Sequence, residues 1–289
     1  MPELRFEDLV FAYPCSGSHP ALNGASGRLG SNNIVGLVGK NGAGKSTLSK
    51  VLNGVLRPRT GILWLGREPI QPVVRPGHVV AYAFQNPDDQ LFLATVCSEV
   101  AFGPRNLGMG REETDEAVKQ ALEDFDLRSF AQEHPLDLPF VLRKRVAMAS
   151  AIAARRPWTV LDEPTLGQDA EFCDRLVRVL KGLQAEGRGA ILISHDPEFV
   201  FEVCDRILVM GAGKCTWCGS PGAFVAECPP EASGFLNLPG KLVLDLGLPQ
   251  DRTTRGSLAA YLRERDDGSG ADKRVARDSS WRRGQDDCR

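Results

Sequence analysis

A glycine-rich segment, GKNGAGKST at residues 39–47, restricts the possible folds of this chain more than any other feature. It fits the pattern G-x-x-x-x-G-K-[ST], whose backbone N–H groups and lysine surround phosphate groups. The apolar run before it, NIVGLVG, is typical of a strand buried on both faces. After it, apolar side chains at helical spacing predict a helix that Pro58 ends, with one face formed by Leu48, Val51, Leu52 and Val55. The sequence therefore predicts a strand, a phosphate-binding loop and a helix in succession.

Each position of this loop has an expected part in holding a nucleoside triphosphate. Glycines allow the tight turn that aims backbone N–H groups inward, and the helix adds the positive end of its dipole. Lys45 is expected to reach the terminal phosphates, and the Ser46 hydroxyl to take one position on Mg²⁺. The alternative, a glycine-rich turn with a chance Lys-Ser pair, is disfavoured because strand, loop and helix occur together. We therefore expect the nucleotide to be bound by Gly39, Asn41, Gly42, Ala43, Gly44, Lys45, Ser46 and Thr47.

An acidic pair ends a second apolar run, WTVLD at residues 158–162. Splitting a triphosphate requires an acid that orients the metal and a group that places the attacking water. Asp162 at the end of the run suits the first task, and the adjacent Glu163 suits the second. Taken alone, such a pair is more often a solvated turn or a helix cap. The phosphate loop earlier in the chain favours the catalytic interpretation.

The remaining pattern alternates strands and helices. A third apolar run, AILIS at residues 190–194, is separated from WTVLD by a helix whose apolar face consists of Phe172, Leu176, Val179, Leu180 and Leu183. This order implies crossover connections and a largely parallel sheet. The first residues, LRFEDLVFAYP, alternate in the manner of an antiparallel edge strand. The sequence thus predicts an α/β fold in which a mostly parallel sheet accompanies an N-terminal antiparallel β subdomain.

Between Gln85 and Pro157 the strand pattern disappears, which predicts a helical subdomain at about residues 86–157 inside a nucleotide-binding domain of residues 1–228. Two amphipathic helices are expected there, with apolar faces formed by Val118, Ala121, Leu122 and Phe125 and by Val146, Ala149, Ile152 and Ala153. Residues 229–265 are expected to form a short C-terminal extension in which LVLDLGLP and SLAAYLRER pack. Residues 266–289 mix charges with Gly and Ser, so we expect a disordered tail.

Bulk composition and charge exclude several classes of protein. A formal net charge of -2 gives no general attraction to nucleic acid or anionic lipid. No apolar run approaches the roughly 18 residues that span a bilayer, and the start MPELRFEDLV has acids where a secretory signal is apolar. Cys215, Cys218 and Cys228 imitate a metal site but lack a second pair, so we expect ordinary thiols in a strand, KCTWCGSP, that runs into a turn. We therefore expect a cytoplasmic protein that does not bind nucleic acid.

The order of five motifs resembles that of the nucleotide-binding subunit of an ABC transporter. These motifs are GKNGAGKST, FQNPDDQLF, TVLDEPT, LGQD and ISHD, and the resemblance covers residues 1 to about 228. It implies a P-loop NTPase fold of the ABC type that binds and hydrolyses ATP with Mg²⁺. A resemblance of this kind also implies that ATP is hydrolysed at the interface between two such subunits.

The resemblance assigns a role to each motif residue. It implies that Tyr13 stacks on adenine, that Gln85 joins the metal to the contact with the membrane subunit, that Asp169 is the acid of the dimer loop, and that His195 bridges the γ-phosphate to the water. In isolation, Tyr13 would be read as packing, Gln85 as part of a turn and His195 as a core histidine. The implied catalytic residues are Glu163, His195, Lys45 and Gln85, and the implied metal site consists of Ser46, Gln85 and Asp162.

A narrower resemblance concerns the segment QNPDDQLF, with its second glutamine Gln90 and an aromatic after it. It is similar to the ATPases of energy-coupling factor transporters, which power uptake of vitamins and of transition metals such as cobalt and nickel. The pieces after residue 228 also resemble the short C-terminal extension of that group. This implies a peripheral protein at the inner face of the cell membrane, with integral membrane subunits and a second ATPase subunit as partners.

The chain departs from the family at the signature segment. Where such ATPases carry Leu-Ser-Gly-Gly-Gln, this chain has LPFVL at residues 138–142, followed by the basic run RKR. In the family, the serine hydroxyl and glycine N–H groups contact the γ-phosphate held by the partner subunit. Pro139 has neither a hydroxyl nor an N–H, and the Cβ atoms of Phe140 and Val141 obstruct the close approach that glycine allows.

Two explanations of this departure remain open. In the first, Pro139 simply occupies the first position of a helix, with no consequence because the partner's nucleotide site is idle. Alternatively, the helix dipole and Arg143 partly replace the lost donors. The first favours a heterodimer, in which an intact signature from a different ATPase subunit completes this chain's own site.

Two other function classes compete with a transporter subunit. A soluble ABC-type ATPase acting on ribosomes or DNA usually carries two phosphate loops or a long coiled coil, and this sequence shows neither. A regulatory module that binds ATP with little turnover is compatible with the altered signature, although Glu163 argues against it.

Overall fold

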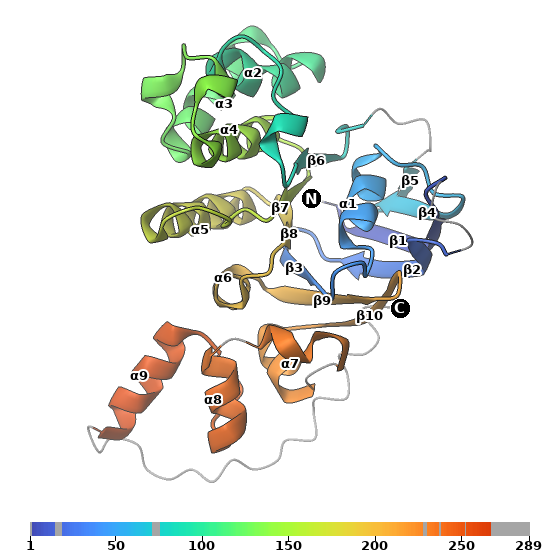
Figure 1. Ribbon diagram of the computed structural model, residues 1–289, viewed down its shortest axis with the longest axis vertical. Coiled ribbons are helices and arrows are strands. Elements are labelled where there is room, and N and C mark those ends of the chain that lie inside the picture. The colour runs from blue at the N-terminus through green and yellow to red at the C-terminus, as the bar shows by residue number, and fades with distance from the viewer. Residues whose placement is uncertain are drawn as a thin grey trace.

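The larger of two sheets forms the centre of the computed structural model, which describes residues 2–14, 19–70, 76–227, 230–236, 238–251 and 253–266 (Figure 1). Its order is β10-β9-β3-β8-β7-β6, and all neighbours are parallel except the β9–β10 pair. The strands are β3 (Ile34–Val38), β6 (Val80–Ala83), β7 (Trp158–Asp162), β8 (Gly189–Ile193), β9 (Arg206–Gly211) and β10 (Lys214–Gly219). The predicted α/β fold with a mostly parallel sheet is therefore confirmed.

The smaller sheet is antiparallel, as predicted, and has the order β2-β1-β4-β5. Its strands are β1 (Leu4–Phe11), β2 (Leu22–Leu29), β4 (Thr60–Leu65) and β5 (Glu68–Ile70). The prediction that the first strand lies at an edge is wrong, because β1 pairs with β2 on one side and with β4 on the other. Alternation of apolar residues shows that one face is buried, but it does not reveal a partner about fifty residues away.

Helix α1 (Lys45–Asn53) follows the phosphate loop and buries Leu48, Val51 and Leu52, as predicted. It ends earlier than predicted. Gly54 takes a left-handed conformation at φ 89°, and its N–H donates to the Val51 carbonyl. Val55 is consequently 46% exposed, and glycine, not Pro58, ends the helix.

The segment between Gln85 and Pro157 contains helices and, among its described residues, no strand. These elements are η1 (Pro87–Asp89), α2 (Val96–Asn106), α3 (Arg111–Asp124), η2 (Arg128–Phe130), η3 (Pro135–Asp137) and α4 (Phe140–Ala153). Figure 1 shows them as a green block beyond the β6 end of the large sheet, on the opposite side of it from α8 and α9. The two predicted amphipathic helices are α3 and α4, and their predicted apolar residues are buried.

The remaining helices are α5 (Ala170–Ala185), α6 (Pro197–Val203), α7 (Pro221–Glu227), η4 (Pro230–Phe235), α8 (Leu238–Leu246) and α9 (Arg255–Asp266). The two pieces predicted to pack after residue 228 form α8 and α9, and α9 includes Asp266, which the sequence assigned to the tail. Cys228 and residues 267–289 lie outside the described residues. In the described part of the chain, no three His, Cys, Asp or Glu side chains come together as a metal site, and no helix is both long and apolar enough to cross a membrane.

Two apolar cores lie on opposite faces of the large sheet. In β3, Ile34 and Val38 face the core shared with α2 to α6, whereas Val35 and Leu37 face the core shared with α1 and the small sheet. Burial on both faces is the reason why the central strands read as unbroken apolar runs. Because β3, β7 and β8 are parallel, their carboxyl ends meet at one edge, where a ligand binds in an open α/β sheet.

Candidate nucleotide-binding site

The loop between β3 and α1 depends on glycine for its backbone conformation. Gly39, Gly42 and Gly44 have φ values of 146°, 79° and 102°, which L-residues with a side chain rarely adopt. At Gly44 an added Cβ would also lie 2.6 Å from the Ala21 carbonyl oxygen, which cannot move without shifting the backbone. The turn that the sequence predicts is therefore present, and it leads directly into the helix.

The N-terminus of α1 offers unpaired donors to an anion. The first helical hydrogen bond runs from the Leu48 N–H to the Gly44 carbonyl at 2.8 Å, and no side chain caps the helix. The N–H groups of Lys45, Ser46 and Thr47 therefore have no acceptor within the helix, and they carry its positive dipole end. Ala43 differs, because its N–H donates to the Lys40 carbonyl.

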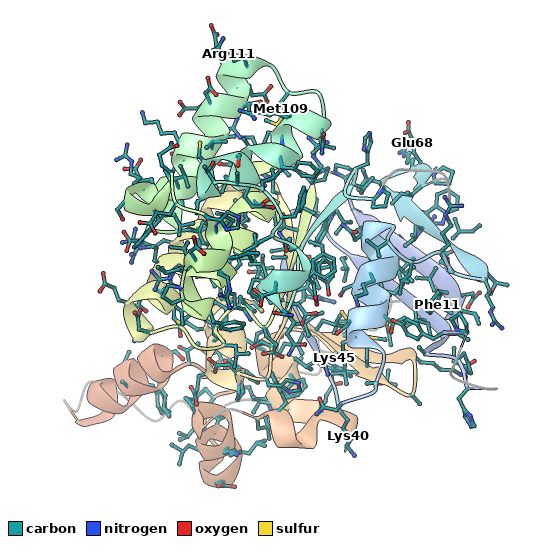
Figure 2. All side chains as sticks on the ribbon, turned by 45° about the horizontal axis from the view of Figure 1, so that its top comes forward. Phe11, Lys40, Lys45, Glu68, Met109 and Arg111 are labelled. Atoms are coloured by element: carbon teal, nitrogen blue, oxygen red, sulfur yellow. The ribbon has the colours of Figure 1, made fainter. Side chains whose placement is uncertain are left out.

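The Lys45 side chain folds back over the loop. Its Nζ donates to the Gly39 carbonyl at 2.7 Å and to the Lys40 carbonyl at 3.2 Å, and the residue is buried. Burial lowers the pKa of the ammonium, while the charges of Glu163 and Asp162 oppose that shift. Figure 2 shows Lys45 at the start of α1, with Lys40 farther out. The ammonium is thus held against the loop by two backbone carbonyls, where the charges of both acids act on it.

Asp162 lies buried at the end of β7, where the Tyr82 hydroxyl of the neighbouring strand β6 donates to its Oδ2 at 2.7 Å. Burial raises the pKa of Asp162, whereas hydrogen bonds from Tyr82 and Ser46 and the charge of Lys144 lower it. Burial and the adjacent carboxylate also raise the pKa of Tyr82, which keeps the hydroxyl protonated as a donor. Sequence reasoning missed Tyr82, although a hydroxyl inside the buried run VAYA is the available signal.

The predicted magnesium ligands are brought together in part. The Ser46 hydroxyl and the Asp162 carboxylate interact directly, and they supply the hard oxygen donors that Mg²⁺ prefers. Gln85, just after β6, is exposed, and its carbonyl accepts a hydrogen bond from Lys144 at 3.4 Å. The donor chemistry of Ser46 and Asp162 therefore fits a magnesium ion.

Glu163 and His195 lie side by side at the ends of β7 and β8. The Glu163 N–H donates to the Ile193 carbonyl at 2.7 Å, and the residue takes a left-handed φ of 52°. Its Oε2 accepts from the His195 backbone N–H at 3.2 Å, and its Oε1 lies 3.6 Å from the imidazole Nε2. Burial raises the pKa of Glu163, and the contacts with His195 oppose that shift. A partly desolvated carboxylate of this kind is suited to accept a proton from water.

Tyr13 lies beside the first turn of α1. Its hydroxyl and the Thr47 hydroxyl are 3.3 Å apart, and its ring packs edge-on against Phe11 with centroids 4.9 Å apart. The ring is 38% exposed. An aromatic surface is therefore placed next to the phosphate-binding helix terminus, as stacking on a base requires.

Asp169 lies apart from these residues. Its Oδ1 accepts from the Phe172 N–H at 2.7 Å and so caps α5, and its Oδ2 is 3.6 Å from an Arg145 guanidinium nitrogen. The adjacent Gln168 accepts from Arg145 at 2.9 Å and donates to the Val141 carbonyl at 3.1 Å. The loop that carries Asp169 is thereby attached to the start of α4 within the same chain.

The altered signature segment forms the start of α4. Pro139 is the N-cap, with φ -54° and ψ 150°, so the prediction that it occupies the first helical position is one residue off. Phe140 is 39% exposed at the helix end, and no side chain caps it. Arg143 folds back beside that end, but its guanidinium is already engaged, since its Nε lies 2.9 Å from Asp88 and its Nη1 donates to the Leu138 carbonyl at 3.0 Å. This geometry disfavours Arg143 as a replacement for the lost signature donors.

Comparison with known proteins agrees with these features. A family model described as ABC transporter matches residues 22–166, which include the phosphate loop and the acidic pair. This chain belongs to the ABC transporter family. It is accordingly an ABC-type ATPase that binds and hydrolyses ATP.

Relatives of this ABC ATPase include two energy-coupling factor transporter ATP-binding proteins. That of Methanothermobacter thermautotrophicus is 38% identical over 83% of this chain and 77% of its own length. That of Methanocaldococcus jannaschii is 36% identical over 81% of this chain and 84% of its own length. Among solved structures, cbiO1 from Clostridium perfringens, part of the ABC transporter complex cbiONQ, has a TM-score of 0.67 and 31% identity over 83% of this chain and 98% of that chain.

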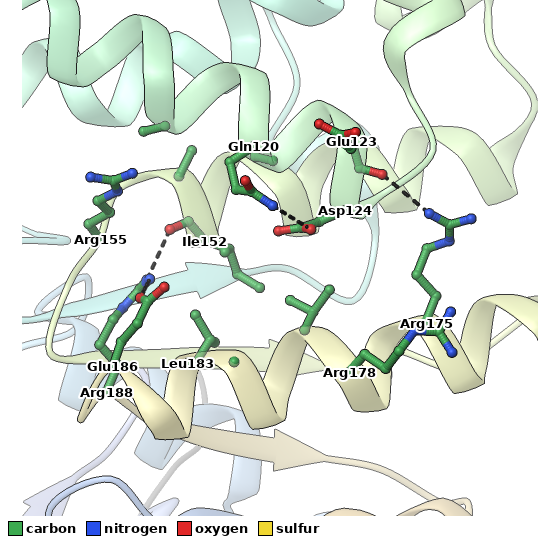
Figure 3. A pocket seen from close by; sticks show the side chains of 15 residues that line it. Gln120, Glu123, Asp124, Ile152, Arg155, Arg175, Arg178, Leu183, Glu186 and Arg188 are labelled. Carbon is green, nitrogen blue, oxygen red and sulfur yellow. Dashed lines mark hydrogen bonds and ion pairs between the residues drawn. The ribbon is translucent and has the colours of Figure 1, made fainter.

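The ABC chain also has a cavity of about 490 Å³ between α3, α4 and α5 (Figure 3). Arg175 of α5 donates to the Glu123 carbonyl across it at 3.3 Å, and Arg188 donates to the Ile152 carbonyl at 2.9 Å. None of the phosphate-loop residues lines it. The cavity therefore lies between the helical insertion and α5, and it is not the nucleotide site.

Proposed function

We propose that this chain is the ATPase subunit of an energy-coupling factor transporter that takes up a micronutrient, either a vitamin or a transition-metal ion. The relatives from Methanothermobacter thermautotrophicus and Methanocaldococcus jannaschii are described as energy-coupling factor transporter ATP-binding proteins, and the solved cbiO1 is described as part of the ABC transporter complex cbiONQ. The observation that carries the catalytic part is the contact of Glu163 with His195, beside the Asp162–Ser46 pair and Lys45. The transported solute would be recognised by integral membrane subunits.

The residues of the site divide the reaction among them. Lys45 and the free N–H groups of α1 bind the phosphates, and the exposed ring of Tyr13 stacks on adenine. Ser46, Asp162 and Gln85 would hold Mg²⁺, which neutralises charge on the phosphates when bound. Glu163 orients the attacking water and takes its proton, and His195 links the water to the γ-phosphate. Gln85 couples the presence of the bound metal and nucleotide to the contact with the membrane subunit.

We further propose that the chain works in a heterodimer with a different ATPase subunit. Its own signature segment lacks the hydroxyl and N–H of a serine at Pro139, and the side chains of Phe140 and Val141 stand at the helix end. Each charge-assisted hydrogen bond lost is worth about 1.5 to 3 kcal/mol, so several lost together lower turnover by powers of ten. The site built on Lys45 and Glu163 of this chain is intact, and it would be completed by the partner's signature. Asp169 would then contact the partner across the interface.

The test compares ATP turnover of the purified chain alone with turnover after addition of the ATPase subunit that co-purifies with it from membranes. We expect little hydrolysis alone and strong stimulation by the partner. In the mixture, Glu163→Gln should trap ATP without turning it over. Vigorous hydrolysis by the chain alone would contradict the heterodimer.

A matched variant restores the signature in the same chain. Pro139→Ser combined with Phe140→Gly and Val141→Gly should allow two copies to hydrolyse ATP without the partner. If neither the restored variant nor the mixture turns over ATP, the chain is instead a regulatory ATP-binding module. Co-purification with a ribosome or DNA, and not with membrane subunits, would exclude the transporter assignment.

A further inference from the structure

The three basic residues after the signature segment connect α4 to two other segments, Arg143 and Lys144 to residues 85–89 and Arg145 to the loop before α5. Arg143 forms an ion pair with Asp88 in η1 at 2.9 Å. Arg145 donates to Gln168 at 2.9 Å, and its guanidinium lies 4.1 Å from the centroid of the Phe172 ring. Lys144 lies between them and donates to the Gln85 carbonyl. Both arginines are paired with groups outside the catalytic cluster, whereas Lys144 bonds to Gln85, and the charges of Glu163 and Asp162 act on it.

Lys144 differs from the two arginines because its ammonium is buried and forms no close ion pair among the described residues. The residue is 1% exposed, and within the described ranges its ammonium donates one long hydrogen bond, at 3.4 Å, and lies 6.0 Å from the centroid of the Phe140 ring. The acidic groups that act on it are Glu163 and Asp162, and burial lowers its pKa against their influence. A buried ammonium costs several kcal/mol unless nearby charges compensate it. The catalytic carboxylates supply that compensation.

The two carboxylates in turn need a positive charge nearby. Asp162 and Glu163 are adjacent buried carboxylates, and each raises the cost of ionising the other. Three lysines act on the pair, Lys45 and Lys50 of α1 and Lys144 of α4, and of these Lys45 and Lys144 are buried. When phosphates bind, the Lys45 ammonium is directed to them. Lys144 is then the buried cation of this group that is left to the carboxylates.

We propose that Lys144 is a positioning residue for ATP hydrolysis, whose fixed positive charge balances Asp162 and Glu163 and whose bond to the Gln85 carbonyl holds that loop beside them. Lys144 lies one helical turn after Phe140, so a movement of the start of α4 also moves this charge. The electrostatic environment of this chain's catalytic acids therefore depends on the position of the helix end that faces the partner. The inference rests on the proposed roles of Asp162 and Glu163.

The test separates charge from hydrogen bonding. Lys144→Gln keeps a donor for the Gln85 carbonyl but removes the charge, Lys144→Arg keeps the charge, and Lys119→Gln removes a charge from the exposed face of α3 as a control. In the complex with the partner ATPase, kcat and KM are measured together with the ATP dissociation constant in Mg²⁺ and in EDTA.

Lys144→Gln should lower kcat roughly ten-fold or more and change KM less than about three-fold. A cation near Asp162 repels Mg²⁺ and attracts free ATP. Loss of the Lys144 charge should therefore raise the ATP dissociation constant in EDTA, divided by that in Mg²⁺, by about ten-fold. Lys144→Arg should restore most of both values, and Lys119→Gln should match the unsubstituted chain. A purely structural role for Lys144 would not raise that ratio.

The inference would be overturned if Lys144→Gln kept the wild-type kcat and the wild-type ratio of ATP dissociation constants. A hydrogen bond to the Gln85 carbonyl, without the charge, would then be enough for normal hydrolysis. If Lys144→Gln does not fold, Lys144→Met replaces it, and if neither folds, a changed ratio in Lys144→Arg overturns the inference. Glu163→Gln is measured in parallel. Undiminished hydrolysis by Glu163→Gln would reject the proposed site itself, whereas its inactivity beside a normal Lys144→Gln would reject the role of Lys144 alone.

Discussion

The Tyr82 hydroxyl donates a 2.7 Å hydrogen bond to the Asp162 carboxylate, and both residues are buried. They lie on the neighbouring parallel strands β6 and β7, in which Tyr82 pairs with Val160, two residues before Asp162. The acid expected to face the metal is thus oriented from inside the sheet, by a strand that precedes the Gln85 loop.

Tyr82→Phe should lower both the stability of the chain and its magnesium-dependent affinity for ATP. Removing a hydrogen bond to a charged, buried group costs about 1.5 to 3 kcal/mol. Denaturant unfolding in the absence of nucleotide measures the first effect, and ATP titration in Mg²⁺ measures the second. Tyr13→Phe, whose hydroxyl meets Thr47 beside an exposed ring, serves as the control for stability. Equal unfolding midpoints for both variants would show that the Tyr82 bond contributes nothing.

Gly44→Ala should destabilise the fold and abolish tight ATP binding. The residue has φ 102°, and its new Cβ would lie 2.6 Å from the Ala21 carbonyl oxygen. A non-glycine residue forced into such a conformation costs of order 1 to 3 kcal/mol. Gly110→Ala is the matched control, because Gly110 has an ordinary φ of -59° and open space at Cβ. Thermal melting of the two variants should differ clearly, and similar melting temperatures would contradict the strain at Gly44.

Gln90→Leu should loosen the attachment of the Gln85 loop to α4. The Gln90 side chain accepts from the Phe84 N–H at 3.0 Å and donates to the Ala147 carbonyl at 3.0 Å. Leucine leaves both backbone groups without these partners, at about 1 to 3 kcal/mol each when they stay buried. Hydrogen exchange at the Phe84 amide should accelerate relative to Gln132→Leu, a change at an exposed position. Unchanged exchange would mean that another group protects this amide.

Asp124→Asn should change how stability depends on pH. Burial raises the pKa of Asp124, and its hydrogen bond with Gln120 opposes that shift. A carboxyl with a raised pKa in the folded state costs stability as pH rises through its usual value of 3.8, and that cost persists at neutral pH. Asparagine accepts the same hydrogen bond without a charge. The variant should therefore gain midpoint temperature at pH 7 over the unsubstituted chain and lose the gain near pH 3; a gain that grows in acid would contradict this sign.

The parts of the fold that the sequence predicts well are those with a local cause. The runs that form β3, β7 and β8 are apolar because both faces of these strands are buried, and the phosphate loop carries glycines where the backbone requires them. The acid before α5 could also have been assigned as a helix cap, since Asp169 stands directly before Ala170.

The parts that the sequence does not predict depend on residues far apart in the chain. The interior place of β1 follows from its pairing with β4, and the role of Tyr82 follows from the neighbouring position of β7. Lys144 belongs to a basic run that resembles a solvated helix face, and only the packing of α4 against β6 and the Gln85 loop shows that it is buried. Pairing and packing of this kind leave no periodic signal near the residue concerned.

The left-handed backbone of Glu163 means that stability and catalysis favour different residues at this position. Glycine or asparagine would adopt the same torsion with less strain, by an amount of order 1 kcal/mol. Either residue would relax the backbone, but it would lose the contacts of the Glu163 carboxylate with His195 and, on the proposed mechanism, the group that takes a proton from water. On the proposed mechanism, Glu163 is therefore a position where backbone strain accompanies a catalytic carboxylate.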